Sequence, residues 1–457
     1  MKNIIIPQKY RLIINKISDA AKETNFDVYI VGGFVRDLLI GRESEDLDIM
    51  VSSKLCDKNE RLSGINFSKF LANKYKLRNP INFEKFGTSK LFIDGKEVEF
   101  IMPRREYYFE NSRNPRTYLA SLKQDALRRD FTINALFLRL SDMKILDFTL
   151  NGINDIKNKT IRVTDIKNCE IIFKQDPLRI LRAIRQSLQL NFTIENKTYD
   201  AMKISAMHIK IISSERIKNE INKILIENTP SKAFRMMNEI NILTKIFPEI
   251  TKLNTSLRQY EYRTKDLFTN TMIILDKVTN NLILRMSALL FNIGKHSIIH
   301  KSVDTTKIEI ILKRLTYSKK FIQQITSIIK NSIYFSIYYS SSWTDTDVRK
   351  FVEKCDNELD LIMEFLKIYS NNNKTCIKFV EFKKRIKCLK SKNMLYVKSE
   401  LLTGIEITNM FNIPPGKLIK KIKNKIKEMQ FQNPDLTKAK AIKIIKKNIN
   451  TIIKNYR

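Results

Sequence analysis

The chain has 457 residues, of which 43% are hydrophobic and 29% charged, so it has a globular composition that excludes a disordered or collagen-like chain. Lys and Arg total 83 against 48 Asp and Glu, which gives a net charge of +35 and points to a polyanionic partner. Lys, Asn and Ile are overused throughout, however, as in proteins of A+T-rich genomes. Charge alone therefore does not identify nucleic acid as the partner.

Cysteine usage and hydropathy indicate the cellular compartment in which the protein is expected. The five cysteines, at positions 56, 169, 355, 376 and 388, form no C-x-x-C pair, which argues against a disulfide scaffold and a structural zinc site. No apolar run reaches the roughly 18 residues of a membrane span. The first seven residues hold too short an apolar run for a signal peptide. We expect a cytoplasmic protein without a membrane partner, and the sequence leaves its oligomeric state open.

The first 150 residues alternate between helix and strand signals. Apolar residues recur at helical spacing within 1–25, and a second helix signal, 34–40, ends at Gly41. Strand signals lie at 28–31, 47–51, 91–93, 98–102, 131–140 and 145–148. Asp94-Gly95 joins two of these strands as a hairpin turn. This pattern predicts an α/β head built around a small sheet.

After residue 165 the strand signals stop. Helical periodicity follows at 176–190, 214–226, 230–242, 270–390 and 417–457. Only 10 Gly and 10 Pro occur in the whole chain, which favours long helices. The fold class is therefore predicted to be α+β, an N-terminal head followed by an all-helical remainder.

The strongest chemical signal is a glycine pair between a strand and a helix. Gly32 and Gly33 follow the strand at 28–31 and open the helix at 34–40. Backbone N–H groups at such a helix start bind anions, and glycine allows a phosphate to approach closely. Arg36, one turn into the helix, is expected to fork onto a phosphate oxygen.

Two carboxylates follow this cradle on the next strand. Asp46 and Asp48 are two residues apart, so both leave the same face of the strand. Beside a phosphate site they suit Mg²⁺, and two such ions activate a 3′-hydroxyl and neutralise a leaving pyrophosphate. Glu99, on the hairpin strand, is a third candidate carboxylate. Alternation places Glu97 on the same face, so the choice between them stays open.

These residues resemble the nucleotidyltransferase superfamily, specifically the class II bacterial tRNA CCA-adding enzymes and their poly(A) polymerase relatives. Further segments resemble family motifs in the family's order, at 128–136, 147–152, 176–185 and 215–221. The resemblance implies that Gly32, Gly33 and Arg36 hold the triphosphate and that Asp46 and Asp48 bind the metal. It also implies that Glu99 stands at a usually acidic position and that Arg129 and Asp130 contact the nucleotide's ribose and phosphate.

Asp176 and Arg179 stand in the segment that resembles the family's base-selecting helix. At i and i+3 on one helix face they offer acceptor oxygens and a forked donor, which suits the Watson–Crick edges of cytosine and adenine. A mismatched base edge costs about 1–3 kcal/mol for each unmet bond. Arg182 and Arg185 continue the row and are expected to reach phosphates. Gln175 replaces the acid that the family usually has there, which could loosen base fidelity.

The helical remainder departs from the family further. Many members carry an HD-type phosphohydrolase site, with His and Asp ligands to metal. Here Asn270 stands where a His is expected, and Phe291 and Asn292 replace the His-Asp pair itself. We expect a degenerate HD-type body that binds no catalytic metal. Residues 404–416 resemble the tail module of the same enzymes.

The predicted organisation is a nucleotidyltransferase head at 1–160, a helical neck at 161–230, a body at 231–385 and a basic, tRNA-binding tail at 386–457. The predicted function is addition of C, C and A to the 3′ end of tRNA from CTP and ATP with Mg²⁺. A poly(A) polymerase or a partial, A-only or CC-only, adding enzyme is the alternative. An inactive RNA-binding protein is a distant third. The Arg- and Tyr-rich loop at 104–116 and the segment 83–89 favour full CCA addition.

Overall fold

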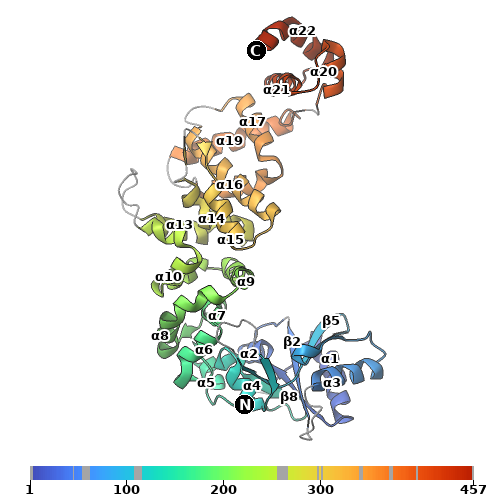
Figure 1. Ribbon diagram of the computed structural model, residues 1–457, viewed down its shortest axis with the longest axis vertical. Coiled ribbons are helices and arrows are strands. Elements are labelled where there is room, and N and C mark those ends of the chain that lie inside the picture. Colours follow the sequence, from blue (N-terminus) through green and yellow to red (C-terminus); the bar gives the residue numbers. More distant parts are fainter. Residues whose placement is uncertain are drawn as a thin grey trace. The chain divides into compact units, whose positions relative to one another are not determined.

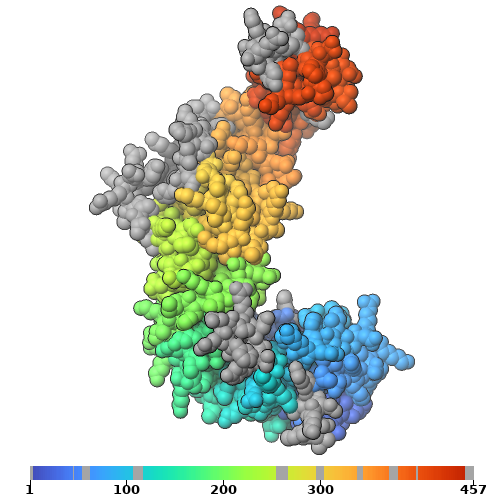
Figure 2. All heavy atoms as spheres, viewed as in Figure 1, coloured from blue at the N-terminus to red at the C-terminus, as the bar shows by residue number. Residues whose placement is uncertain are grey.

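The computed structural model describes residues 4–44, 46–53, 62–107, 116–254, 266–295, 298–299, 302–338, 343–369, 374–397 and 400–454. The chain forms two compact units, Met1–Thr251 and Lys252–Arg457. Figure 1 shows all the strands of the large sheet, among them β2, β5 and β8, in the first unit, and the second unit as helices with short connections. Figure 2 shows the same chain with every side chain filled in. The α+β fold class is confirmed.

A seven-stranded sheet, in the order β3-β4-β5-β2-β1-β8-β9, forms the centre of the first unit. Its strands are β1 (Phe26–Val31), β2 (Leu47–Ser53), β3 (Ile81–Phe83), β4 (Thr88–Ile93), β5 (Lys96–Ile101), β8 (Leu136–Arg139) and β9 (Ile145–Asp147). β2 and β5 run parallel, and the other neighbours are antiparallel. The predicted strands all exist, whereas β3 at the sheet edge carried no strand signal.

One face of this sheet is covered by helices. The covering helices are α1 (Gln8–Lys22), α2 (Gly33–Ile40) and α3 (Ser63–Lys74). Phe67 of α3 contacts Phe100 of β5, and the hydroxyl of Ser68 donates to Ser89 of β4. Phe100 pairs in register with both Ser89 and Ile49, so these three residues share the covered face.

The opposite face carries the polar residues of the same strands. Its apolar end packs under α4 (Leu122–Arg128), in a cluster of Tyr29, Val31, Met50, Ala126, Ala135 and Phe137. Asp48, Glu99 and Lys90 stand on this face beyond the cluster, because each alternates with a residue of the covered face. The period of two along each strand therefore brings these charged residues onto one face of the sheet.

The helices that follow the sheet complete the first unit. They are α5 (Gly152–Lys157), α6 (Cys169–Gln175), α7 (Leu178–Leu190), α8 (Asn196–Ser205), α9 (Ser214–Leu225), α10 (Pro230–Glu239), α11 (Leu243–Ile246) and α12 (Pro248–Thr251). α7 packs against α9 and α10. Short parallel strands β10 (Thr160–Ile161) and β11 (Thr193–Ile194) join the segments before α6 and α8.

The segment 104–116, which we expected to be a loop, begins in one strand of a β-hairpin and ends in the other. β6 (Arg104–Tyr107) pairs antiparallel with β7 (Arg116–Leu119), and the tip at 108–115 lies outside the described residues. Alternation within four-residue strands is too short to predict from sequence. Asp125 of α4 anchors the hairpin, because its carboxylate accepts from the backbone N–H of Arg104 at 3.2 Å.

Where the structure describes it, the second unit is helical apart from the short hairpin of β12 (Ile298–Ile299) and β13 (Ser302–Val303). Its helices are α13 (Leu267–Lys277), α14 (Leu282–Lys295), α15 (Thr306–Arg314), α16 (Lys319–Tyr338), α17 (Asp345–Cys355), α18 (Leu359–Tyr369), α19 (Lys374–Ser391), α20 (Gly404–Phe411), α21 (Lys417–Gln432) and α22 (Lys438–Lys454). Among the described residues, no helix is both long and apolar enough to cross a membrane.

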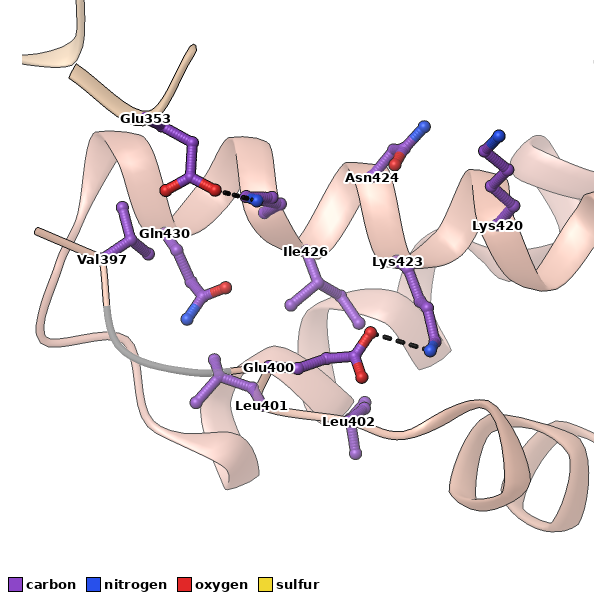
Figure 3. Close-up of a pocket in the computed structure, with 11 residues that line it drawn as sticks. Glu353, Val397, Glu400, Leu401, Leu402, Lys420, Lys423, Asn424, Ile426 and Gln430 are labelled. Atoms are coloured by element: carbon purple, nitrogen blue, oxygen red, sulfur yellow. Dashed lines mark hydrogen bonds and ion pairs between the residues drawn. The ribbon is translucent and has the colours of Figure 1, made fainter. Parts of the chain in front are cut away.

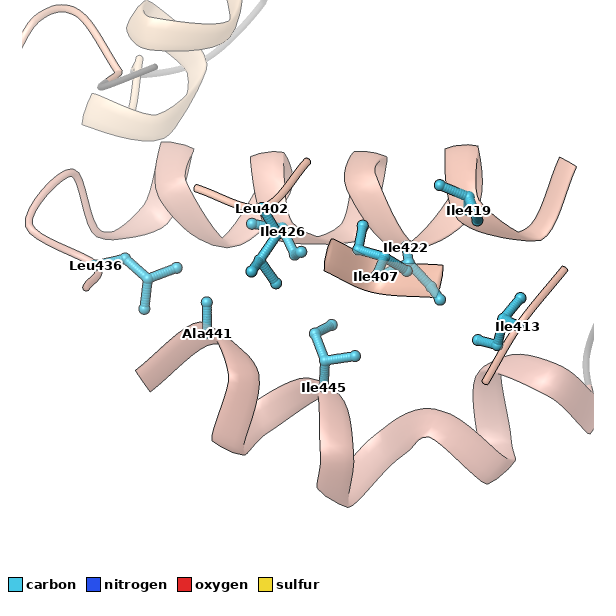
Figure 4. Close-up of a cluster of buried hydrophobic side chains, with 9 residues drawn as sticks. All are labelled: Leu402, Ile407, Ile413, Ile419, Ile422, Ile426, Leu436, Ala441 and Ile445. Atoms are coloured by element: carbon cyan, nitrogen blue, oxygen red, sulfur yellow. The ribbon is translucent and has the colours of Figure 1, made fainter. Parts of the chain in front are cut away.

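The last three helices enclose a core of their own. Figure 4 shows isoleucine side chains of α20, α21 and α22 pointing toward one another, with Ile422 and Ile445 almost wholly buried. Each isoleucine lies on the apolar face of a helix whose other positions are largely Lys, which is the amphipathic pattern expected from the sequence at 417–457. The lysines of α21 and α22 therefore remain on the outside of this bundle.

Candidate active site

The glycine turn has a backbone conformation that requires glycine. Gly32 ends β1 with φ 77° and ψ −143°, and α2 begins at Gly33. A Cβ on Gly32 would lie 3.4 Å from a guanidinium nitrogen of Arg129 and 3.7 Å from a carboxylate oxygen of Asp48. The predicted phosphate turn, one predicted carboxylate and one predicted nucleotide-binding arginine thus converge on one point.

Asp48 and Glu99 lie side by side across two parallel strands. Asp48 of β2 pairs in register with Glu99 of β5, and both side chains are partly exposed. Burial raises the pKa of Asp48 to about 6, assisted by the negative charge of Glu99 and opposed by Arg129. Two carboxylates on neighbouring paired strands favour a cation between them or a proton on one of them.

Lys90 decides between the two glutamates that sequence alternation could not separate. Its ammonium forms an ion pair with Glu97, whose side chain is 45% exposed. Glu97 pairs in register with Phe92, whereas Glu99 pairs with both Asp48 and Lys90. Glu99 is therefore the glutamate that faces Asp48, and Glu97 is occupied by the lysine.

Asp46 stands apart from this pair. It precedes β2, which begins at Leu47, and it is exposed, although its charge contributes to the raised pKa of Asp48. Within the described part of the chain, no three His, Cys, Asp or Glu side chains are grouped as a ready metal site. The facing oxygens of Asp48 and Glu99 are nevertheless the hard donors that Mg²⁺ prefers, so the residues fit that ion.

Arg129 is oriented by a carboxylate that the sequence analysis did not single out. Asp125 of α4 is fully buried and forms ion pairs with Arg128 at 2.6 Å and with Arg129 at 3.0 Å. Burial alone would raise the pKa of Asp125, but Arg129 and Arg128 outweigh it and leave that pKa below its usual value. The guanidinium of Arg129 also lies over the ring of Phe137, 5.2 Å from its centroid.

Arg36 lies beneath the glycine turn with its donors engaged inside the fold. Its guanidinium forms two hydrogen bonds of 2.9 Å with Asp37 and one of 2.7 Å with the side-chain oxygen of Asn134. The side chain is buried, and a guanidinium nitrogen lies 3.4 Å from the Cβ position of Gly33. In this arrangement Arg36 supports the turn from below, with its charge balanced by Asp37.

The base-selecting segment differs from the expected single helix. α7 begins at Leu178, and Asp176 lies before it with φ −138° and ψ 87°. The prediction that Asp176 and Arg179 share one helix face is therefore wrong, because Pro177 disfavours helical backbone at the residue before it. The carboxylate of Asp176 accepts from Arg216 of α9 at 3.1 Å, whereas Arg179 donates to the backbone oxygen of Arg128 at 2.6 Å.

The other two predicted arginines of α7 also have carboxylate partners. Arg182 pairs with Asp130 at 2.6 Å, and Arg185 pairs with Glu220 of α9 at 2.7 Å. Burial would raise the pKa of Asp130, but Arg182 and the amide of Asn134 hold it far below its usual range. Asp130 and Arg182 thereby tie α7 to the segment that follows α4.

Asn134 connects the two arginine-rich groups, and no sequence signal singled it out. Its amide donates to Asp130 at 2.9 Å and to Gln186 of α7 at 3.0 Å, while its oxygen accepts from Arg36. Asn134 lies within the segment 128–136 that we had compared with a family motif. Membership of that motif was therefore the only feature of the sequence that could have pointed to Asn134.

The positions that were compared with metal ligands lie in the second unit. The buried amide of Asn292 donates to the hydroxyl of Thr271 at 2.8 Å, and Asn270 is half-buried beside it on α13. The ring of Phe291 packs 5.2 Å from Phe365 and 4.6 Å from Tyr369. An amide–hydroxyl hydrogen bond and an aromatic cluster therefore occupy this part of the interior.

A cavity of about 360 Å³ opens between α21 and the segment 397–402. Figure 3 shows Ile426 and Gln430 pointing from α21 toward Leu401 and Leu402. The lysines of its wall are paired with glutamates, Lys423 with Glu400 and Lys427 with Glu353. Lys420 also lines this cavity.

Comparison with known proteins finds two family models and several curated relatives that match part of this chain. Residues 28–162 match the poly A polymerase head domain, and residues 191–253 match the probable RNA and SrmB-binding site of polymerase A. An A-adding tRNA nucleotidyltransferase of Geobacter sulfurreducens is 32% identical over 264 residues, which are 56% of this chain and 28% of that protein. A CCA-adding enzyme of Pediococcus pentosaceus is 32% identical over 57% of this chain and 59% of its own length.

The chain thus matches less than two thirds of the length of these curated relatives. Among solved structures, the Bacillus stearothermophilus CCA-adding enzyme in complex with CTP superposes with a TM-score of 0.70. That alignment covers 98% of this chain and 100% of the other at 19% sequence identity. At this identity the likeness shows a shared fold.

Proposed function

We propose that this chain, whose residues 28–162 and 191–253 match models of poly(A) polymerase domains, adds nucleotides to the 3′ end of tRNA without a nucleic-acid template. The observation that carries this proposal is the convergence of Asp48 and Arg129 within 3.7 Å of the position that a Cβ on Gly32 would occupy. A turn of exposed N–H groups, a cation and a metal-seeking carboxylate together suit a nucleoside triphosphate.

Asp48 and Glu99 are assigned to Mg²⁺, with Asp46 joining them from its exposed position before β2. Bound there, Mg²⁺ would lower the pKa of the attacking 3′-hydroxyl and neutralise charge on the leaving pyrophosphate. The turn at Gly32 and Gly33 would hold the triphosphate through backbone N–H groups. Arg129, fixed by Asp125, would place its charge beside the same phosphates and the ribose.

Arg36 and Asp130 are proposed to act from inside the fold. Arg36 holds the turn at Gly33 in place, and Asp130 keeps Arg182 on the nucleotide side of α7. Arg185, paired with Glu220, would do the same one turn later. Each of these pairs fixes the conformation of a long side chain before the nucleotide arrives, which reduces the entropy lost on binding.

Asp176 and Arg179 are proposed to choose the base. Arg179 is already held by the backbone oxygen of Arg128 and Asp176 by Arg216, so each has hydrogen-bonding capacity left on a fixed group. Their acceptor and donor atoms would pair with the edges of cytosine and adenine, and guanine and uracil would leave them unpaired.

We propose full C, C, A addition from CTP and ATP as the activity. The test is incubation with tRNAs that end at the discriminator base, at the first C or at the second C, with CTP and ATP given singly and together. Sequencing of the products identifies which nucleotides are added and in which order. Growth of each tRNA to a terminal CCA supports the proposal, and extension of only the tRNA ending in two C residues would establish an A-adding enzyme instead.

The A-adding alternative is kept because the relative from Geobacter sulfurreducens carries that name at the same identity as the CCA-adding relative. The distant reading as an inactive RNA-binding protein predicts no extension of any tRNA under any nucleotide condition. The same assay therefore separates all three. A long homopolymer of A on any RNA would identify a poly(A) polymerase.

The basic second unit is proposed to hold the tRNA body. Exposed lysines such as Lys425 and Lys443 lie on α21 and α22, on which Ile422 and Ile445 are buried, so positive charge is presented on the surface. Such a surface binds the phosphate backbone by charge and by the shape of the RNA helix. The division into head, neck, body and tail and a cytoplasmic location remain predictions.

A further inference from the structure

The open face of the sheet continues from the carboxylates to the edge of the head. Asp48 on β2 pairs with Glu99 on β5, Glu99 pairs with Lys90 on β4, and Lys90 pairs with Ile81 on β3. Residues paired in register point to the same side of a sheet, so these four form one row. With neighbouring strands about 4.8 Å apart, the row spans roughly 14 Å.

The far end of this row is apolar and exposed. Ile81 is 55% exposed, Phe83 is 41% exposed, and Phe92, two residues beyond Lys90 on β4, is 51% exposed. Phe83 follows Ile81 by two residues on β3, so all three share the face of Asp48 and Glu99. Large apolar residues grouped on an open face beside a functional site are typical of a binding surface.

Lys90 stands between this apolar edge and the carboxylates. Its side chain is 33% exposed, and its ammonium is held by Glu97, which is itself 45% exposed. A single ion pair at such exposure is worth little and is readily exchanged for a stronger partner. Lys85 adds a second positive charge near the edge, 6.0 Å from the ring centroid of Phe86.

We propose that this edge, formed by Lys90, Phe92, Ile81 and Phe83, binds the single-stranded 3′ end of the RNA that is extended. An unpaired base stacks on Phe92 near Ile81, Phe83 lies two residues further along β3 within reach of the next base, and a backbone phosphate draws Lys90 away from Glu97. The terminal 3′-hydroxyl is thereby directed along the row toward Asp48 and Glu99. Exposed aromatic rings and a cation are the usual means of holding single-stranded nucleic acid.

This inference rests on the proposed function and adds the place where the acceptor strand lies. Single-stranded RNA is favoured over an apolar protein partner by continuity with the carboxylate pair and by the lysine within the patch. An apolar protein partner would offer no anionic group to the ammonium of Lys90.

The test compares Phe92→Ala, Phe92→Tyr and Lys90→Gln in the full-length protein. Michaelis constants for tRNA and for nucleotide are measured separately, together with the affinity for a short single-stranded RNA by fluorescence anisotropy. We expect Phe92→Ala to raise the KM for tRNA about tenfold, the loss of one stacked base, and to leave the KM for nucleotide unchanged. Phe92→Tyr should restore the KM for tRNA, because the ring is what stacks.

Lys90→Gln should weaken RNA binding and lower the slope of log affinity against log salt by about 0.7, the loss of one phosphate contact on a single strand. Matched controls are Leu12→Ala and Lys22→Ala, both on α1, where Leu12 is 70% exposed and the partner of Lys22 is the exposed Asp19. Neither control should change RNA affinity. Melting temperatures of all variants show whether a loss reflects unfolding.

An unchanged KM for tRNA in Phe92→Ala, with a wild-type protein that extends tRNA, would overturn the subsite and leave the proposed function standing. If the wild-type protein extends no tRNA, the proposed function fails, and the anisotropy measurement alone still decides whether this edge binds RNA. Dimers of the wild-type protein that Phe92→Ala dissociates would show instead that the edge joins two copies of the chain.

Discussion

At the scale of single residues, the site depends on carboxylates whose surroundings differ although their sequence positions look alike. Asp48 is largely enclosed beside Glu99, and its pKa is raised to about 6 by burial and by that neighbour. Asp46, two residues earlier, is exposed before the strand begins. Glu97 and Glu99 differ in the same way, because Lys90 neutralises only the first by direct contact.

These differences predict that substitution of Asp48 stabilises the protein and that substitution of Asp46 does not. Asp48→Asn should abolish nucleotide addition, since Mg²⁺ loses an anionic ligand, yet leave tRNA binding largely intact. Without Mg²⁺ at neutral pH, it should also stabilise the protein by on the order of 2 kcal/mol, because it removes a buried charge that repels Glu99. Asp46→Ala should abolish nucleotide addition without increasing the stability of the folded protein. Activity assays and thermal unfolding in EDTA check both, with Asp19→Asn as the exposed control.

Base choice is also a property of single residues. Asp176→Ala or Arg179→Ala should raise incorporation of UMP and GMP relative to CMP and AMP, with a smaller effect on overall nucleotide binding. The physical reason is that one partner of the base edge is lost while the triphosphate contacts remain. Competition assays with all four nucleotides measure the ratio. Misincorporation at the wild-type level would show that these residues do not read the base.

At the scale of elements, α7 is held by the ion pairs of two of its arginines, Arg182 and Arg185, which lie about one turn apart. Asp130 ties it to the segment after α4, and Glu220 of α9 ties it through Arg185. Asn134 joins the Asp130 group to Arg36 under the glycine turn. Movement of α7 would therefore be transmitted to the triphosphate turn through a short chain of hydrogen bonds.

The Asp130–Arg182 pair gives the protein a defined acid sensitivity. Its folded-state pKa is far below the ordinary value, so the stabilisation is complete above about pH 4 and is lost as the pH falls through the folded value. Asp130→Asn should cost on the order of 3 kcal/mol at pH 7. The difference from wild type should stay constant from pH 8 to 5 and shrink below pH 4. Denaturant unfolding at several pH values measures it, and a difference constant down to pH 2 would contradict the assignment.

At the scale of the whole molecule, the residues that we propose to carry the chemistry lie in the first unit, and the second unit is proposed to supply charge for RNA binding. The positions that we compared with phosphohydrolase ligands lie among residues that bond to one another, Asn292 to Thr271, and Phe291 against Phe365 and Tyr369. Amide and phenyl groups are poor ligands for a hydrolytic metal.

The second unit is therefore expected to bind no transition metal and to hydrolyse neither 2′,3′-cyclic phosphates nor 2′-nucleotides. Metal analysis of the purified protein, together with phosphodiesterase assays in Ni²⁺ and Mn²⁺, checks this expectation. The Asp46→Ala, Asp48→Ala double variant serves as the reference, because it removes the metal site of the head. Stoichiometric metal that persists in that variant, with measurable hydrolysis, would show that ligands elsewhere had been overlooked.

The sequence by itself determined most of the elements of the head and the residues that we propose to carry its chemistry. A strand, two glycines and a helix specify the anion turn because only glycine adopts φ 77° without strain, and period-two alternation fixed the face of Asp48. Local patterns of this kind are set by backbone geometry, so they can be recognised before any contact is known.

Only the tertiary structure decided which of these residues face one another. The parallel pairing of β2 with β5 selects Glu99 over Glu97, and no local pattern fixes the register of strands that are 40 residues or more apart. Likewise, the partners of Asp176, Arg36 and Arg185 come from distant segments or from a proline that breaks the expected helix. Such pairings depend on how elements pack, because a side chain's charge specifies what it can bind and the fold specifies what lies within its reach.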